Sequence, residues 1–194
     1  MWVNNYNNST ANESYEIIET GDGDLVFAGY SGTQHGDYKW FMVKTDSDGN
    51  QIWKKAKSSV GDAILYGLCE SPSGGYVAAG FCNSWRSNLI TKRNPNNGNS
   101  TFTECIIGEI SVAGIYDITP AIGGGYYLID ERSNLTKIDE DGQVIFTESV
   151  QSNLAVIELD NGDLVIGGGN AFLDGGYGGS ATITRLSFSS VAGQ

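Results

Sequence analysis

The sequence is poor in the residues that most often carry catalysis and metal binding. It has one histidine, His35, and three cysteines, Cys69, Cys82 and Cys105, none of them in C-x-x-C spacing. That inventory argues against a zinc site, and any Ser-His-Asp or Cys-His-Asn arrangement would have to be built around His35 alone. A domain of this size does not need disulfides, so we expect the three cysteines to be thiols that pack as small hydrophobic side chains.

Basic charge is also scarce. The chain has 11 Lys and Arg against 23 Asp and Glu, a formal net charge of −12. Such a field repels phosphate backbones and anionic lipids. We therefore expect neither nucleic acid nor a membrane surface as a partner.

Long apolar runs are missing. No stretch approaches the 18 or so residues that a membrane span needs. The opening "MWVNNYNNST" has neither a basic segment nor an apolar one, so the chain shows no signal peptide. Proline is rare, at three residues, whereas the 27 glycines indicate many turns.

A pattern repeats four times along the chain. Each repeat has a glycine turn followed by a run of β-formers: "GDGDLVFAGY" (21–30), "PSGGYVAAGF" (72–81), "IGGGYYLIDE" (122–131) and "DNGDLVIGGG" (160–169). Short apolar stretches precede these turns and begin at Tyr15, Tyr66, Tyr116 and Leu154, always ten residues before the first Leu or Tyr of the run. Each pair of stretches predicts a β-hairpin.

A second hairpin completes the repeat. "VKTDSDGNQIW" (43–53) matches "TKRNPNNGNSTF" (91–102) and "TKIDEDGQVIF" (136–146), and "ITRLSF" (183–188) joins them. The matches align Lys44, Lys92, Lys137 and Arg185, and they place Gly49, Gly98 and Gly142 four residues before Trp53, Phe102 and Phe146. We expect the glycines to adopt positive φ in the turns and the aromatic side chains to anchor the outermost strand.

Four-stranded units in tandem, without helical periodicity, predict an all-β fold: a β-propeller of four blades, each with four antiparallel strands. A single domain, 1–194, would contain repeats at about 15–64, 65–114, 115–152 and 153–194 plus 1–14. Trp2 precedes Tyr15 by 13 residues, as Trp53 precedes Tyr66. The N-terminal strand is therefore expected to complete the last blade. Closure between chains fits equally well, either as a homodimer through strand exchange or with this chain as half or a fragment of a larger ring.

The pattern "DGG-Y-V-x-A-G" followed by "V-K-x-D-x-D-G-x-x-x-W" resembles the tandem propeller repeats of secreted bacterial and archaeal proteins. It is also similar to the tryptophan-docking repeats of quinoprotein dehydrogenases and their non-enzymatic relatives. The resemblance implies a propeller and an extracellular or periplasmic location. It supplies no cofactor-binding constellation, so we expect no cofactor.

Acidic turns such as "DSDGN" (46–50) and "DEDGQ" (139–143) resemble the start of a calcium loop. Position 12 counted from Asp46 is Lys57, where an EF-hand requires Glu. Plain hairpin turns are the preferred interpretation, although calcium binding stays possible. A separate metal hypothesis concerns Glu16 and Asp117, which lie at equivalent positions of the first and third repeats. They would face each other across the central channel of a four-bladed propeller and bind a cation or ordered water.

The predicted loops between strands contain the candidate ligand-binding residues. Propeller loops gather on one face, and there the sequence offers amphipathic side chains typical of recognition surfaces: Tyr6, His35, Tyr38, Trp85, Arg86 and Tyr177. We therefore expect a non-catalytic binding or interaction module for a carbohydrate or protein ligand. Packing between blades is the competing explanation of these aromatic residues. The alternative function is a carboxylate-dependent hydrolase or lyase.

Overall fold

The computed structural model of the chain describes residues 1–6, 11–34, 36–57, 61–82, 87–106, 114–169 and 181–187, without the side chains of 103–106. All regular elements in these ranges are β-strands. The all-β, propeller-like architecture that the sequence predicted is confirmed. None of the described residues forms a helix with the length and hydrophobicity needed to cross a membrane.

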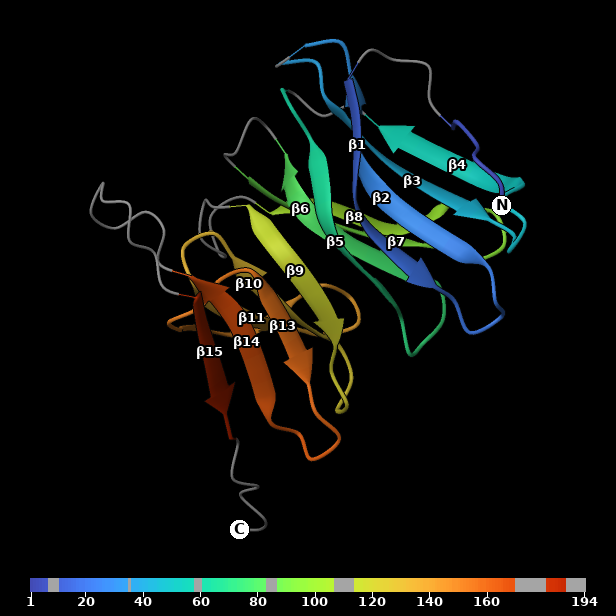
Figure 1. Cartoon of the computed structure of the whole chain (residues 1–194). Coiled ribbons are helices and arrows are strands. Elements are labelled where there is room, and N and C mark those ends of the chain that lie inside the picture. The colour runs from blue at the N-terminus through green and yellow to red at the C-terminus, as the bar shows by residue number, and fades with distance from the viewer. Residues whose placement is uncertain are drawn as a thin grey trace.

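The strands form four separate antiparallel sheets (Figure 1). The first sheet contains β1 (Ala11–Glu19), β2 (Leu25–Gly32), β3 (Lys39–Thr45) and β4 (Gln51–Lys57). The second contains β5 (Ile64–Glu70), β6 (Tyr76–Cys82), β7 (Ser87–Arg93) and β8 (Ser100–Ile106). The third contains β9 (Ile115–Pro120), β10 (Tyr126–Asp130), β11 (Asn134–Ile138) and β12 (Val144–Ser149). The fourth contains β13 (Ala155–Glu158), β14 (Leu164–Gly169) and β15 (Ala181–Leu186).

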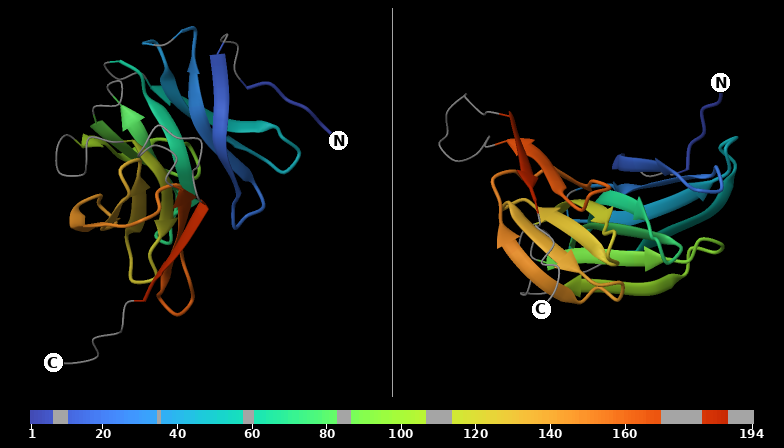
Figure 2. Two further views of the ribbon diagram at one scale, coloured as in Figure 1. Left: turned by 60° about the vertical axis from the view of Figure 1, so that its left-hand side comes forward. Right: turned by 90° about the horizontal axis from the view of Figure 1, so that it is seen from below.

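Each sheet is a meander in which neighbouring strands are consecutive in the sequence. The first strands of successive sheets lie side by side, β1 against β5, β5 against β9 and β9 against β13. The sheets fan out from these inner strands, with the first and fourth sheets at the two ends of the fan (Figure 2).

Three large apolar clusters hold successive sheets together, and a smaller one of Tyr30, Ile64 and Phe81 adds to the junction of the first two sheets. The first joins Val26 and Met42 to Leu65 and Leu89. The second packs β6 and β7 against β9 and β10, and the third packs β10 and β11 against β13 and β14. Because strand side chains alternate between faces, one face of each middle sheet contacts the sheet before it and the other contacts the sheet after it.

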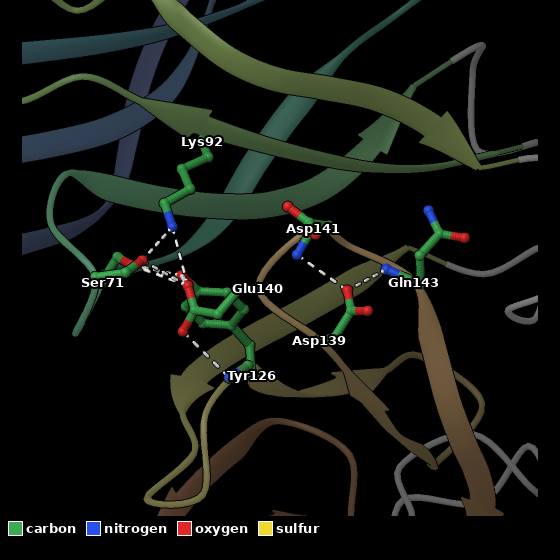
Figure 3. A network of polar contacts seen from close by, with 9 residues as sticks. Ser71, Lys92, Tyr126, Asp139, Glu140, Asp141 and Gln143 are labelled. Carbon is green, nitrogen blue, oxygen red and sulfur yellow. Dashed lines mark hydrogen bonds and ion pairs between the residues drawn. The ribbon is translucent and has the colours of Figure 1, made fainter.

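The acidic stretch 46–50 is a hairpin turn between β3 and β4. The Asp46 carboxylate accepts backbone N–H bonds from Asp48 at 3.0 Å and Asn50 at 2.8 Å, and Gly49 has a φ of 80°. This confirms the turn interpretation, because the side chain caps its own loop. Asp139 caps the corresponding turn of the third sheet in the same way (Figure 3). The described residues contain no group of three or more His, Cys, Asp or Glu that could hold a metal.

In the first two sheets the repeated lysine links one sheet to the next. Lys92 reaches across to the third sheet, where its Nζ lies 3.0 Å from Glu140 Oε2 and 5.9 Å from the centre of the Tyr126 ring (Figure 3). Lys44 lies 5.4 Å from the ring centre of Tyr76 in the second sheet. A buried alkyl stem with a paired ammonium at its tip contributes both packing and electrostatic attraction at these junctions.

The expectation that the N-terminal strand completes the last sheet is wrong for this structure. Residues 1–6 form no strand, and the fourth sheet has three strands among the described residues. The N-terminal segment instead docks on the turn at Gly49 in the first sheet. The carbonyl of Gly49 accepts bonds from Asn4 Nδ2 at 2.8 Å and from the Tyr6 hydroxyl at 2.7 Å. These bonds hold the segment at the opposite end of the fan from β15.

The expectation of three free thiols is also wrong. Cys69 is a free, buried thiol, but Cys82 is disulfide-bonded. The side chain of Cys105 lies outside the described residues. Sequence spacing gave no sign of this bond, because disulfide formation depends on the approach of two side chains in the folded sheet.

Candidate functional site: a row of tyrosines on the inner strands

The inner strands of the first three sheets each contain a β-bulge. The pairing register skips one residue between Ser14 and Glu16 in β1 and one between Leu65 and Gly67 in β5. In β9 the partners of Ile129 and Asp130 are Asp117 and Ile115, so the residue between them is skipped too. The skipped residues are Tyr15, Tyr66 and Tyr116. A bulged residue lies outside the ladder, and its side chain takes a direction that regular alternation does not allow.

The three bulged tyrosines touch one another across the sheet boundaries. The ring centroids of Tyr15 and Tyr66 lie 4.7 Å apart, and those of Tyr66 and Tyr116 lie 5.6 Å apart. The first pair is inclined at 58° and the second at 72°. Three blades thus contribute one aromatic side chain each to a continuous strip, which we call the tyrosine row.

Further aromatic side chains extend the row at the first sheet. Tyr30 of β2 lies 6.1 Å from Tyr15, and Tyr38 lies 4.4 Å from Tyr30. Tyr15 is exposed, whereas Tyr66 and Tyr116 are half-buried. The row is therefore anchored in the protein and still reachable from solvent.

Carboxylates border the tyrosine row. The Tyr15 hydroxyl donates a 2.7 Å hydrogen bond to Glu13 Oε2. Burial raises the pKa of Tyr15 well above its ordinary value, and the bond to Glu13 acts in the same direction. Burial also raises the pKa of Tyr116, with a further contribution from the charge of Glu131. A tyrosine hydroxyl is protonated near neutral pH even at its ordinary pKa of about 10, so these hydroxyls can donate hydrogen bonds.

Asp117 follows the bulge of β9 and joins the third sheet to the fourth. Its Oδ1 accepts the N–H of Ile118 and its Oδ2 accepts the N–H of Val156, both at 2.8 Å. Burial raises the pKa of Asp117 to about 6 although these two bonds lower it, and the charge of Glu16 adds to the increase. The two carboxylates of the cation hypothesis therefore influence each other, and cation binding there stays a proposal.

The other sequence-predicted ligand residues divide into two groups. Tyr38 joins the tyrosine row through Tyr30. Tyr6 lies at the far end of β3 from Tyr38, where its ring packs 5.2 Å from that of Phe27. His35, Trp85, Arg86 and Tyr177 lie outside the described residues.

The sequence pattern marked the three bulged tyrosines as the first residues of predicted strands and did not place them in a binding site. Their identical position in three repeats was a signal. Nothing in the sequence announced the bulges that turn them out of the ladder, because a bulge depends on the pairing between two strands.

Several solved structures resemble most of this chain. No protein-family model matches it, and no curated protein sequence does either. A protein of unknown function from Bacteroides caccae is similar, with 18% identity and a TM-score of 0.68 over 95% of this chain and 60% of that one. BamB from Moraxella catarrhalis has 13% identity and a TM-score of 0.57 over 83% of this chain and 45% of its own.

Virginiamycin B lyase from Staphylococcus aureus is also similar, with 13% identity and a TM-score of 0.56 over 91% of this chain and 56% of its own. BamB and virginiamycin B lyase are β-propeller proteins. The fold is propeller-like. At these identities the likeness concerns architecture alone, since one fold hosts many functions. The chain spans about half of the length of these proteins, from 45% to 60%.

Proposed function

We propose that the chain is a non-catalytic binding module that holds a protein ligand on the tyrosine row. The observation that carries the proposal is the contact of Tyr15, Tyr66 and Tyr116 across three sheets. Packing within a sheet does not require a bulged tyrosine at the same place in three repeats. Tyrosine supplies a large amphipathic contact area with little conformational entropy to lose, as recognition surfaces require.

The geometry of the row favours an extended protein segment with basic side chains over a glycan. Successive rings are inclined at 58° and 72°, so they do not form one flat platform for sugar rings. Lysine or arginine side chains can lie over tilted tyrosines and pair with Glu13 or Glu131. The net charge of −12 would also accelerate encounter with a basic partner.

The proposed setting is an oxidising compartment outside the cytoplasm. The support is the disulfide at Cys82, because such bonds persist mainly in secreted and periplasmic proteins.

Arrays of short peptides and of glycans test the proposal. We expect binding to peptides that carry Lys or Arg and loss of binding when those residues are replaced by Glu. Tyr66→Ala, at the centre of the row, should weaken peptide binding by about tenfold or more. Tyr6→Ala is the matched control and should bind as the wild type does.

Two outcomes would contradict the proposal. Binding to glycans alone would replace the protein ligand by a carbohydrate. Equal loss in Tyr6→Ala and Tyr66→Ala would remove the tyrosine row as the site.

A second candidate function is that of a hydrolase or lyase. The observation that favours it is the pKa of Asp117, which burial raises to about 6. A general acid works best when its pKa lies near the pH at which the enzyme operates. Incubation of the array ligands with the protein, followed by mass spectrometry, would reveal turnover. Turnover that is lost in Asp117→Asn would support catalysis. If the ligands stay intact, the enzyme proposal fails and the binding-module proposal stands.

A further inference from the structure

The two end sheets of the fan each expose apolar side chains on the face turned away from the fan: Ile157 and Ile183 on the fourth sheet, and Ile17 on the first. In the middle of the fan, the equivalent faces are buried against a neighbouring sheet. Because the sheets are repeats, the exposed fractions of equivalent side chains can be compared between a covered sheet and an end sheet.

The outer face of the fourth sheet has the composition of a junction between sheets. It carries Ile157, Val165 and Ile183, which correspond in the repeat to Cys69, Val77 and Ile90 of the second sheet. Ile90 is 0% exposed against the third sheet, whereas Ile183 is 82% exposed. Cys69 is 7% exposed, and Ile157 is 53% exposed. The fourth sheet therefore presents the surface on which a further sheet would pack.

The first sheet presents the complementary surface. Ile17 and Phe27 correspond to Leu68 and Ala78, which pack toward the first sheet. Leu68 is 4% exposed and Ile17 is 58% exposed.

Phe41 and Val43, on the same face of the first sheet as Ile17, are buried, and the ring of Tyr6 packs on Phe27. The exposed part of this face is therefore the part at β1. The exposed apolar side chains gathered on the fourth sheet, together with Ile17 on the first, mark sites of association.

The strand edges complement each other in the same way. β15 has no outer neighbour among the described residues. Residues 1–6 lie where the outer strand of a preceding sheet would lie, because Trp2 contacts Gly49 as Trp53 of β4 contacts Gly98 in the next sheet. Among the described residues, the outer edge of β15 and the segment 1–6, which forms no strand, are the two halves of a strand addition.

We propose that a second copy of this chain covers both faces. The fourth sheet of one copy packs against the first sheet of the other, and residues 1–6 of the latter lie along β15 as its outer strand. The same junction occurs twice, so two copies related by a two-fold axis close into a ring without free faces or edges. Head-to-tail junctions form a closed ring when a whole number of subunit rotations adds up to a full turn.

The size of similar proteins fits this assembly. The chain spans 60% of the Bacteroides caccae protein and 45% of BamB. Two copies therefore supply about the length of chain that these propeller-like proteins hold in one. The inference does not depend on which ligand the tyrosine row binds.

Sedimentation equilibrium and light scattering test the proposal on the full 194-residue chain. The expected species is a dimer of twice the chain mass of 20.7 kDa. Ile183→Asp should give a monomer at concentrations at which the wild type is dimeric. The variant should fold, because the side chain is already in water in the single chain. Ile145→Asp, on the exposed side of β12, is the matched control and should stay dimeric.

Hydrogen exchange provides an independent readout. Amides of β15 should exchange more slowly in the concentrated wild type than in the diluted protein, and this protection should be absent in Ile183→Asp. A wild-type monomer at all concentrations would overturn the proposal, as would open polymers. An Ile183→Asp protein that dimerises like the wild type would overturn the assignment of this face.

Discussion

Trp2 packs on Gly49 as Trp53 packs on Gly98. A methyl group placed on Gly49 would lie 2.7 Å from the Trp2 indole, and one on Gly98 would lie 2.8 Å from the Trp53 indole. Both glycines also have positive φ, at 80° and 65°. Glycine is thus required twice at each turn, for backbone conformation and for the close approach of an aromatic ring.

Gly49→Ala should therefore destabilise the protein more than Gly23→Ala. Both glycines have positive φ, 80° and 83°, but a methyl group at Gly23 would meet nothing within 4 Å. Gly23→Ala should cost about 1 kcal/mol from strain alone, and Gly49→Ala about 1–2 kcal/mol more because Trp2 is displaced. Chemical denaturation measures both.

A double-mutant cycle isolates the tryptophan contribution. In a Trp2→Ala background most of the extra cost of Gly49→Ala should disappear, and what is left should come from Asn4 Nδ2, which lies 2.8 Å from the same methyl position. If the extra cost persists in full in that background, the contact between Trp2 and Gly49 does not explain the glycine.

The pairing of Lys92 with Glu140 predicts acid sensitivity. Burial raises the pKa of Glu140, but hydrogen bonds from Ser73, Lys92, Gly125 N–H and Tyr126 outweigh it and lower the pKa to about 2. A carboxylate with a depressed folded pKa stabilises the fold above its unfolded pKa of about 4.5. This contribution should be lost progressively as the pH falls from about 4.5 to about 2.

The expected loss is about 1–2 kcal/mol after allowance for solvent screening at a side chain that is 34% exposed. Urea unfolding at several pH values should show a smaller decrease for Glu140→Gln over this window. Glu148→Gln on β12 is the matched control and should follow the wild type. Identical slopes in all three proteins would contradict the assignment.

Calcium binding between Glu16 and Asp117 can be tested by thermal unfolding. If the two carboxylates hold a cation, added calcium should raise Tm at neutral pH through its affinity for the native state. Because the pKa of Asp117 is raised to about 6, protonation should compete and the increase should shrink at about pH 5.

The Glu16→Gln, Asp117→Asn double variant should lose the calcium effect. Magnesium chloride at equal ionic strength controls for screening. A calcium effect of the same size in the double variant, or none in the wild type, would show that this site does not exist.

The disulfide at Cys82 predicts an uneven thiol count. A disulfide uses two of the chain's three cysteines, so the denatured, unreduced protein should contain one thiol and the reduced protein three. Burial raises the pKa of Cys69, so the native protein should react very slowly with thiol reagents. Reduction should lower stability by roughly 2–4 kcal/mol. Three thiols without reduction would refute the bond.

The sequence by itself determined the repeated hairpins. Turn residues such as Asp46 and Gly49, and the ten-residue spacing from Tyr15 to Leu25, act within a few residues of one another. Local turn chemistry and period-2 alternation are sufficient to specify strands and the connections between them. The same spacing made Trp2 equivalent to Trp53, and the shared docking on glycine agrees with that equivalence.

Only the tertiary structure decided what these strands meet. The spacing of Trp2 did not say that its segment would dock on Gly49 and not on β15 of the same chain, because that choice depends on how far apart the first and fourth sheets lie. The bulges that bring Tyr15, Tyr66 and Tyr116 together arise from pairing with neighbouring strands, and the bond at Cys82 requires the approach of a second sulfur. Each of these features joins residues that are distant in sequence. Packing between strands and sheets determines which of these residues meet, and local sequence patterns carry no information about that packing.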